Sequence, residues 1–215
     1  FIESIEALAA RAGIEVPYDT NVAANPEKSP IYEALQKATE IFENNLARSD
    51  SAEHVRNYIT KERQISSEVC KKFSLGYAAN SWDALSNQML TKGISEEILI
   101  KAGLAKKNKD GKLFDVFRDR LMFPIKDRKG RVVGFGGRVM NPDDQPKYLN
   151  TGDTAVFQKS RELYGLFEAL EFRKDLKEIY VVEGYMDAIA MYEHGMTNAV
   201  ATLGIATNRF HIQKL

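Results

Sequence analysis

Two acidic residues, Glu183 and Asp187, stand four positions apart in the stretch VVEGYMDAIAMYEHGM, residues 181–196. The apolar run before Glu183 predicts a short buried strand, and the residues from Asp187 onward predict a helix. Gly184 allows a tight turn between them, and ligands gather at the carboxyl ends of strands in β-α-β units. Both carboxylates can therefore point into one crevice, where a divalent metal such as Mg²⁺ would relieve their repulsion. The alternative is structural: Asp187 complements the helix dipole and Glu183 is an edge residue.

A second group of residues is positively charged. Residues 101–140 contain twelve Lys or Arg against four Asp, in a chain that has 30 basic and 30 acidic residues. This block predicts a face that meets an anion, either a nucleic-acid backbone or nucleotide phosphates, although a solvated surface is the alternative. Arg118 and Arg120 are two residues apart at the start of a predicted strand, so we expect them to share a face. The candidate template- or nucleotide-binding cations are Arg118, Arg120, Arg138, Lys147 and Lys159.

Glycines interrupt the predicted strand RVVGFGGRVM at Gly134, Gly136 and Gly137. Because these positions have no side chain, a single-stranded template or an incoming triphosphate could approach the backbone closely there. A bulge or bend in the sheet is the structural alternative.

Polar residues that could contact the same ligand follow in the loop after Lys147. They are Asn150, Thr151 and Thr154, and Tyr148 is the aromatic side chain that we take as a candidate for stacking on a base. We expect the other aromatic residues in the core, including Trp82 at the start of a helix and Phe123, Phe135, Phe157, Tyr164 and Phe167.

Composition narrows the class of protein. With 215 residues and 44% hydrophobic residues, the chain can bury a proper core. One cysteine, Cys70, excludes a disulfide framework and a Cys-rich zinc site within the sequence. The apolar runs are too short for a membrane span and no signal peptide opens the sequence, so we expect a cytoplasmic protein without a membrane partner.

The predicted elements change character along the chain. Helical periodicity covers residues 2–12, and residues 14–30 are polar and proline-rich, as in a linker. Small helices follow over residues 31–103, with Ser29, either Ser66 or Ser67, Ser81 and Ser95 as helix caps. From residue 112 onward a β-hairpin is expected, with its turn at residues 127–130, and a β-α-β unit ends the sequence. The predicted class is α+β: a mixed helical and β-hairpin N-terminal subdomain followed by a partial parallel sheet.

Three blocks carry a resemblance to a known family. VVEGYMD followed by NAVATLG resembles the opening of a Toprim domain, the metal-binding module of primases and several topoisomerases. FRDRLMFPIKDRKGRVVGFGGRVM and PKYLNTGDTAVFQKSRELYGLFEA resemble, in order and spacing, the catalytic core of bacterial DnaG-type primases. The resemblance implies synthesis of RNA primers on single-stranded DNA from ribonucleoside triphosphates, with Mg²⁺ or Mn²⁺ held by Glu183 and Asp187. Glu183 is the catalytic candidate.

The resemblance also implies an organisation and several departures. Residues 1–28 are expected as the linker after a zinc-binding domain, 29–175 as the N-terminal subdomain of the core, and 176–215 as the start of the Toprim domain. The family's zinc-binding domain, its helicase-interaction domain and the later Toprim D-x-D pair are absent from the sequence, so we expect little primer synthesis from these residues alone. Val116 stands where many relatives have a basic residue.

Two alternatives stay open at this point. One is another Toprim enzyme, a topoisomerase or nuclease, although the PKYLN block argues against it. The other is a non-catalytic module that binds single-stranded DNA, for which steep salt dependence without a metal requirement would be diagnostic.

Overall fold

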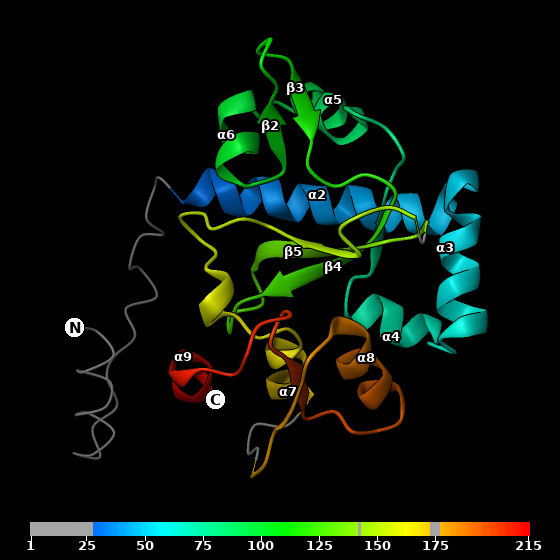
Figure 1. Cartoon of the computed structure of the whole chain (residues 1–215), viewed down its shortest axis with the longest axis vertical. Coiled ribbons are helices and arrows are strands. Elements are labelled where there is room, and N and C mark those ends of the chain that lie inside the picture. The colour runs from blue at the N-terminus through cyan, green and yellow to red at the C-terminus, as the bar shows by residue number, and fades with distance from the viewer. Residues whose placement is uncertain (1–27, 142, 173–176) are drawn as a thin grey trace.

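The computed structural model describes residues 28–141, 143–172 and 177–215. The helix expected over residues 2–12 and nearly all of the expected linker lie outside this part of the chain. Figure 1 shows a small upper lobe above a long helix, a central sheet, and an α/β unit below it. The mixture of helices and strands confirms the α+β class.

The helical elements are α2 (Ser29–Arg48), η1 (Asp50–Ala52), α3 (Glu53–Asn57), η2 (Tyr58–Glu62), α4 (Ser67–Lys72), α5 (Ala84–Thr91), α6 (Glu96–Lys101), η3 (Lys159–Arg161), α7 (Leu166–Phe172), α8 (Tyr185–Glu193) and α9 (Arg209–Lys214). The strands are β1 (Gly76–Ala78), β2 (Ala105–Lys107), β3 (Leu113–Asp115), β4 (Arg120–Lys126), β5 (Val132–Val139), β6 (Tyr148–Asn150), β7 (Tyr180–Val182) and β8 (Ala199–Ala201).

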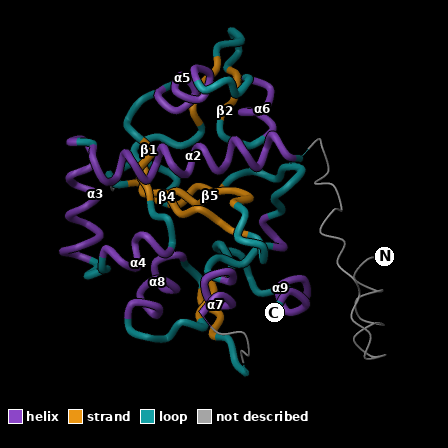
Figure 2. Tube along the Cα trace, turned by 180° about the vertical axis from the view of Figure 1, so that it is seen from behind, coloured by secondary structure: helices purple, strands orange, loops and turns teal. Residues whose placement is uncertain are grey.

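Helix α2 separates the upper lobe from the central sheet. Seen from behind, it lies between the upper lobe and strands β4 and β5 (Figure 2), and it packs on β1 and β5. Its buried side chains recur every three or four residues, as an amphipathic helix requires, and Phe42 meets Phe135 of β5 edge to face at 5.4 Å between ring centroids. Ser29 is already helical, so the cap predicted for it is wrong; Lys28 is the N-cap residue and makes no side-chain cap.

The other caps were predicted with mixed success. Ser95 accepts a hydrogen bond from a backbone N–H group at the start of α6, which confirms that cap. Of the two serines expected at the start of α4, Ser66 is the cap and Ser67 is the first helical residue. Ser81 does not cap α5. Instead the buried carboxylate of Asp115, from β3, accepts the backbone N–H groups of Leu85 and Ser86 at 2.8 and 3.0 Å. A distant residue therefore supplies the acceptors that the local sequence was expected to provide.

The central sheet is antiparallel, with strand order β1-β4-β5-β6. The predicted hairpin is β4 and β5, and its turn closes with a hydrogen bond from Gly130 N to Asp127 O of 2.9 Å, which confirms residues 127–130 as the turn. Strand β6 was predicted as loop, and the two-stranded sheet β2–β3 in the upper lobe was not predicted. Strands β2, β3 and β6 are each three residues long, too short for a periodic signal.

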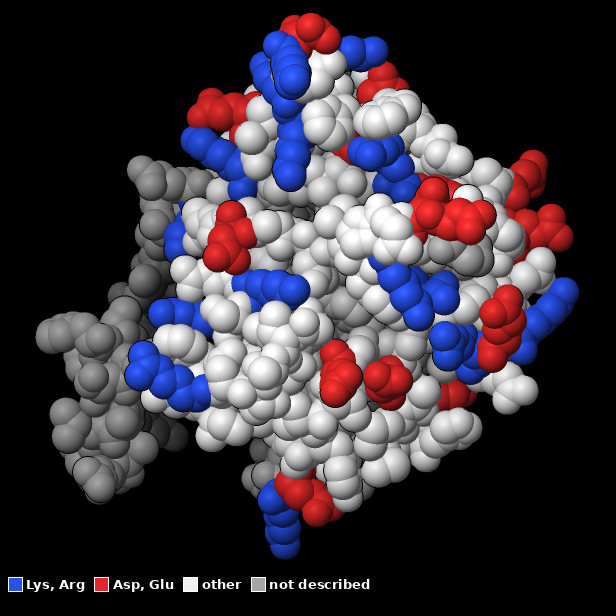
Figure 3. Space-filling model, in the orientation of Figure 1, with Lys and Arg blue, Asp and Glu red and all other residues white. Residues whose placement is uncertain are grey.

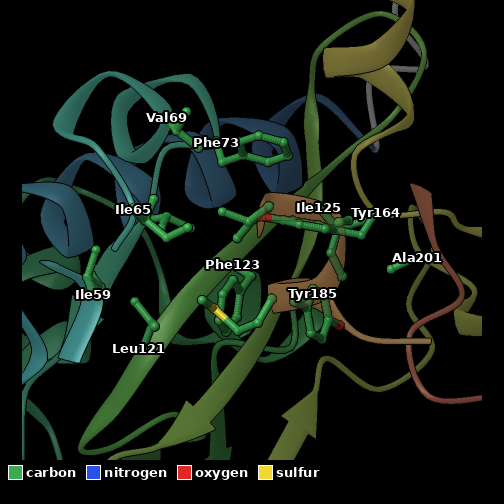
Figure 4. Close-up of a cluster of buried hydrophobic side chains, with 14 of the residues drawn as sticks. Ile59, Ile65, Val69, Phe73, Leu121, Phe123, Ile125, Tyr164, Tyr185 and Ala201 are labelled. Carbon is green, nitrogen blue, oxygen red and sulfur yellow. The ribbon is translucent and has the colours of Figure 1, made fainter. Parts of the chain in front are cut away.

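The C-terminal unit is the predicted β-α-β arrangement. Strands β7 and β8 pair in parallel, with α8 between them in sequence. Tyr164 forms an antiparallel bridge with Ala201, the last residue of β8. Figure 4 shows how this unit joins the central sheet: the ring of Tyr185 lies against that of Phe123 from β4. The two rings stack with centroids 4.8 Å apart and planes 13° apart. One hydrophobic core therefore runs from α3 and α4, across the sheet, to α8.

Candidate functional site

The acidic turn lies where the sequence placed it. Glu183 directly follows β7, Gly184 is the N-cap residue of α8, and Asp187 is in the first turn of that helix. Both carboxylate side chains are exposed. A cleft of about 530 Å³ opens at the carboxyl ends of β7 and β8, lined by Glu183 on one side and by residues 204–207 on the other. The geometry matches the usual position of ligands in parallel sheets.

Asp187 also has a structural role. Its Oδ2 accepts a hydrogen bond from the Gly184 backbone N–H at 3.2 Å, which caps the helix. Within the described ranges, no group of three or more His, Cys, Asp or Glu side chains could enclose a metal ion. Two exposed carboxylates nevertheless fit Mg²⁺, which is commonly bound by one or two carboxylates together with water and substrate phosphates.

Arg118, the first of the candidate binding cations in the sequence, lies beside two aromatic rings. The Arg118 guanidinium lies 4.1 Å from the ring centroid of Trp82 and 5.9 Å from that of Phe114. The prediction that Trp82 is a core residue is wrong, because its side chain is 65% exposed. We call Trp82, Phe114 and Arg118 the aromatic platform. An exposed indole beside a guanidinium has the chemistry that stacks a base and contacts its phosphate.

Arg120 has a different role from Arg118. It is 6% exposed, and its Nη1 donates to the backbone oxygens of Gly137 and Pro146, each at 3.0 Å. Burial lowers the pKa of its guanidinium. Asp119, with a φ of +46°, breaks the strand alternation between the two arginines. Arg118 precedes β4, so the strand alternation that we expected to place it on one face with Arg120 does not extend to it. The two arginines make different contacts, and Arg120 holds the sheet to the loop before β6.

Arg138 belongs to a second cation–aromatic group, which the sequence only partly revealed. Its guanidinium lies 4.3 Å from the ring centroid of Tyr58, and that of Arg63 lies 5.1 Å from the same ring. Arg138 Nε is buried without a hydrogen-bond partner in the described part of the chain. Tyr148 adjoins the group; burial raises its pKa, while the charge of Arg138 lowers it. The sequence analysis did not identify Tyr58 and Arg63, because they are the first residue and the C-cap residue of a π-helical turn, which has no sequence signature.

The polar loop is mostly engaged within the chain. Asn150 Nδ2 donates to Leu203 O at 3.2 Å, and its Oδ1 accepts from the Tyr185 hydroxyl. Thr151 is buried, and Thr154 Oγ1 accepts from backbone N–H groups of its own loop. Among the predicted cations here, Lys147 is exposed and Lys159, in η3, is half-buried.

The glycines of β5 accommodate this chain's own side chains. A Cβ atom on Gly134 would lie 3.0 Å from the Phe157 ring, and one on Gly137 would lie 2.9 Å from Phe117. At Gly136 it would overlap the Tyr185 ring. All three glycines are buried, so the space that we expected a ligand to occupy is filled by packing.

Comparisons with known proteins agree with this arrangement. The family model of the DNA primase catalytic core, N-terminal domain, matches residues 41–170, and a Toprim domain model matches residues 177–215. A DNA primase from Pseudomonas aeruginosa is 44% identical over 221 residues, covering 100% of this chain and 33% of that protein.

Solved structures are similar as well. The structure of a DnaG primase catalytic domain bound to single-stranded DNA matches with a TM-score of 0.79 at 39% identity, covering 87% of this chain and 59% of that one. The RNA polymerase domain of Mycobacterium tuberculosis primase DnaG matches with a TM-score of 0.81 at 36% identity, covering 86% and 60%. The chain spans about a third of the length of the curated relatives it matches. This chain belongs to the DNA primase family, within the part of the catalytic core that extends into the Toprim domain.

Proposed function

We propose that this chain provides the template-binding face and the first carboxylates of the metal site for primer synthesis on single-stranded DNA. The observation that carries the proposal is a pair of exposed carboxylates in one turn at the carboxyl end of β7. Glu183 lines the open cleft there, and Asp187, which is not among the residues that line it, follows in the first turn of α8. The primase match over residues 41–170 favours this reaction over that of another Toprim enzyme.

Glu183 and Asp187 would hold the divalent metal, Mg²⁺ or Mn²⁺. Such an ion neutralises triphosphate charge and stabilises the attacking and leaving oxygens in nucleotidyl transfer. Glu183 is the candidate catalytic residue, because it borders the cleft directly. Asp187 keeps one oxygen on the helix cap, which fixes the direction in which its carboxylate projects.

The template and the ribonucleoside triphosphates would meet the cations. Trp82 and Arg118 offer a ring for a base and a guanidinium for a phosphate. Arg138, whose buried Nε has no hydrogen-bond partner among the described residues, and the exposed Lys147 are candidates for nucleotide phosphates. Lys159 and Tyr148 remain proposed contributors, whereas the buried Arg120, Asn150 and the glycines act through the fold.

Wider partners belong to the whole protein and remain proposals. They are the replicative helicase and the zinc of a separate domain, and the proposed location is the cytoplasm. Within the described residues, no helix combines the length and apolarity that a bilayer crossing requires.

Template binding is testable through the single tryptophan of the sequence. Titration with oligodeoxythymidylate is expected to quench Trp82 emission, because bases stack on exposed indoles. R118A is expected to weaken binding, and R48A, which removes an exposed arginine at the end of α2, is the matched control. Unchanged emission, or equal losses in both variants, would exclude the platform as a template site.

The metal role is tested by primer synthesis in the full-length protein. E183Q is expected to abolish incorporation of labelled ribonucleotides on a single-stranded template. E178Q makes the same charge change at an exposed glutamate before β7 and is expected to leave synthesis intact. Primer synthesis by E183Q at the parent rate would refute the metal assignment.

A further inference from the structure

The β2–β3 hairpin of the upper lobe presents two different faces. Its register pairs Ala105 with Asp115, Lys106 with Phe114, and Lys107 with Leu113. Directly opposed residues of an antiparallel pair lie on the same face of the sheet, and neighbouring pairs alternate between faces. Lys106 and Phe114 therefore share one face, and the two pairs on either side of them share the other.

The inner face is committed to the fold. Ala105 and Asp115 are buried, and Leu113 packs on the hydrophobic core that the upper lobe shares with α2. Lys107, on this face, forms an ion pair with Glu96 of α6, with 2.7 Å between Nζ and Oε2. The charge of Lys107 is thus balanced within the lobe.

The outer face continues the aromatic platform. The Phe114 ring lies 6.1 Å from that of Trp82, centroid to centroid, and the Arg118 guanidinium lies 5.9 Å from Phe114. Lys106 is exposed, directly across the ladder from Phe114. Figure 3 shows several Lys and Arg side chains on the lobe that carries this hairpin, with Asp and Glu side chains among them. An ammonium group and a guanidinium thus flank two aromatic rings on one surface.

Backbone and side-chain bonds hold the hairpin against the platform. Asp115 N donates to Trp82 O at 2.7 Å, which joins the end of β3 to the residue that carries the indole. The Asp115 carboxylate accepts two N–H groups at the start of α5. The positions of Trp82 and the hairpin are therefore fixed relative to one another before any ligand binds, which lowers the entropic cost of binding.

We propose that Lys106 and the outer face of the β2–β3 hairpin extend the template site, with Lys106 binding a backbone phosphate of single-stranded DNA next to the base that stacks on Trp82. The inference rests on the proposed template role of the platform. It extends that site to the hairpin and assigns different roles to two adjacent lysines. Lys106 binds DNA, and Lys107 forms an ion pair with Glu96 within the lobe.

Salt dependence of binding separates the two lysines. Affinity for oligodeoxythymidylate is measured by fluorescence anisotropy over a series of salt concentrations for the wild type, K106A, K107A and K106R. One phosphate contact contributes about 0.7 to the slope of log affinity against log salt for a single strand. K106A is expected to reduce the slope by about that amount, K106R to retain it, and K107A to leave it unchanged.

Each outcome is decisive. Equal slopes for K106A and the wild type, or equal reductions in K106A and K107A, would overturn the role of Lys106. Failure of the proposed function is distinct, because the wild type itself would then show no quenching of Trp82 and no binding. Both lysines are exposed, so the circular dichroism melt of K106A is expected to match the wild type. K107A loses a surface ion pair and is expected to lose less than about 1 kcal/mol of stability.

Discussion

The Tyr185 hydroxyl donates a hydrogen bond to Oδ1 of Asn150, which joins the acidic turn to the edge strand of the central sheet. Tyr185 lies between Glu183 and Asp187 in sequence, and Asn150 is the last residue of β6. The same Asn150 donates to Leu203 O, beyond β8, at 3.2 Å. One amide therefore fixes both sides of the proposed metal cleft against the sheet.

Substitutions of Tyr185 and of Asn150 are expected to lower the free energy of unfolding by different amounts. Y185F loses one hydrogen bond and should cost about 1 kcal/mol, because its ring can still stack on Phe123. N150A loses two hydrogen bonds and leaves a buried hydroxyl unpaired, so we expect about 2 kcal/mol. Urea unfolding followed by circular dichroism measures both, and strictly additive effects in the double variant would contradict a direct bond.

The close approach of Tyr185 to β5 yields a second prediction. G136A is expected to destabilise the chain by about 1–3 kcal/mol, because the new methyl group would overlap the Tyr185 ring. G152A is the control, since nothing lies within 4 Å of a Cβ atom there. Equal urea midpoints for the two variants would show that the ring moves aside freely.

A buried ion pair joins the sheet to α7. Lys126 Nζ lies 3.0 Å from Glu168 Oε1, and the side chains are 11% and 3% exposed. K126A is expected to lower the free energy of unfolding by about 3–5 kcal/mol, because it leaves the buried Glu168 carboxylate without its partner.

The surface pair of Lys37 with Glu33 provides the comparison for this prediction. Its side chains are 30% and 57% exposed, and K37A is expected to cost less than about 1 kcal/mol. The double variant K126M/E168M is expected to recover most of the stability lost in K126A. A loss in K126A no larger than that in K37A would refute the prediction.

Cys70 is expected to react slowly with alkylating reagents at neutral pH. It lines an apolar hollow of about 490 Å³ between α2, η2 and α4, away from the acidic turn. Burial, reinforced by the negative charge of Glu193, raises the pKa of the thiol to about 11 from an ordinary value of 9.0. Because the folded state binds this proton more tightly than the unfolded state, stability is retained below pH 9 and falls as the pH rises towards about 11.

Iodoacetamide labelling against pH checks the shift. The native chain should show a midpoint near 11, and the urea-unfolded chain a midpoint near 9. Coincident midpoints would mean that the thiol is as well solvated in the fold as in the open chain.

The sequence predicted features that local residues determine. The caps at Ser66 and Ser95, the β4–β5 turn and the β-α-β unit around Glu183 all depend on neighbours within a few positions. The cap of α5 was wrong because Asp115, about thirty residues away, provides it.

The site residues divide in the same way. Trp82 and Arg120 exchange their expected environments: the indole is exposed and the guanidinium is buried. Neighbouring residues in the sequence predict neither environment, because each depends on a contact between distant residues. The Trp82 indole lies against Arg118, and the Arg120 guanidinium donates to Gly137 O.

The contacts of Asn150 also bear on the order in which the chain folds. Its bond to Tyr185 spans 35 residues and its bond to Leu203 spans 53, whereas the β4–β5 turn closes within residues 127–130. Contacts between distant residues form more slowly because a longer loop must close first. We therefore expect the hairpin to form early, and the acidic turn to reach its final position only once β6 has joined the sheet. During synthesis from the N-terminus, the residues of the aromatic platform are made before Glu183.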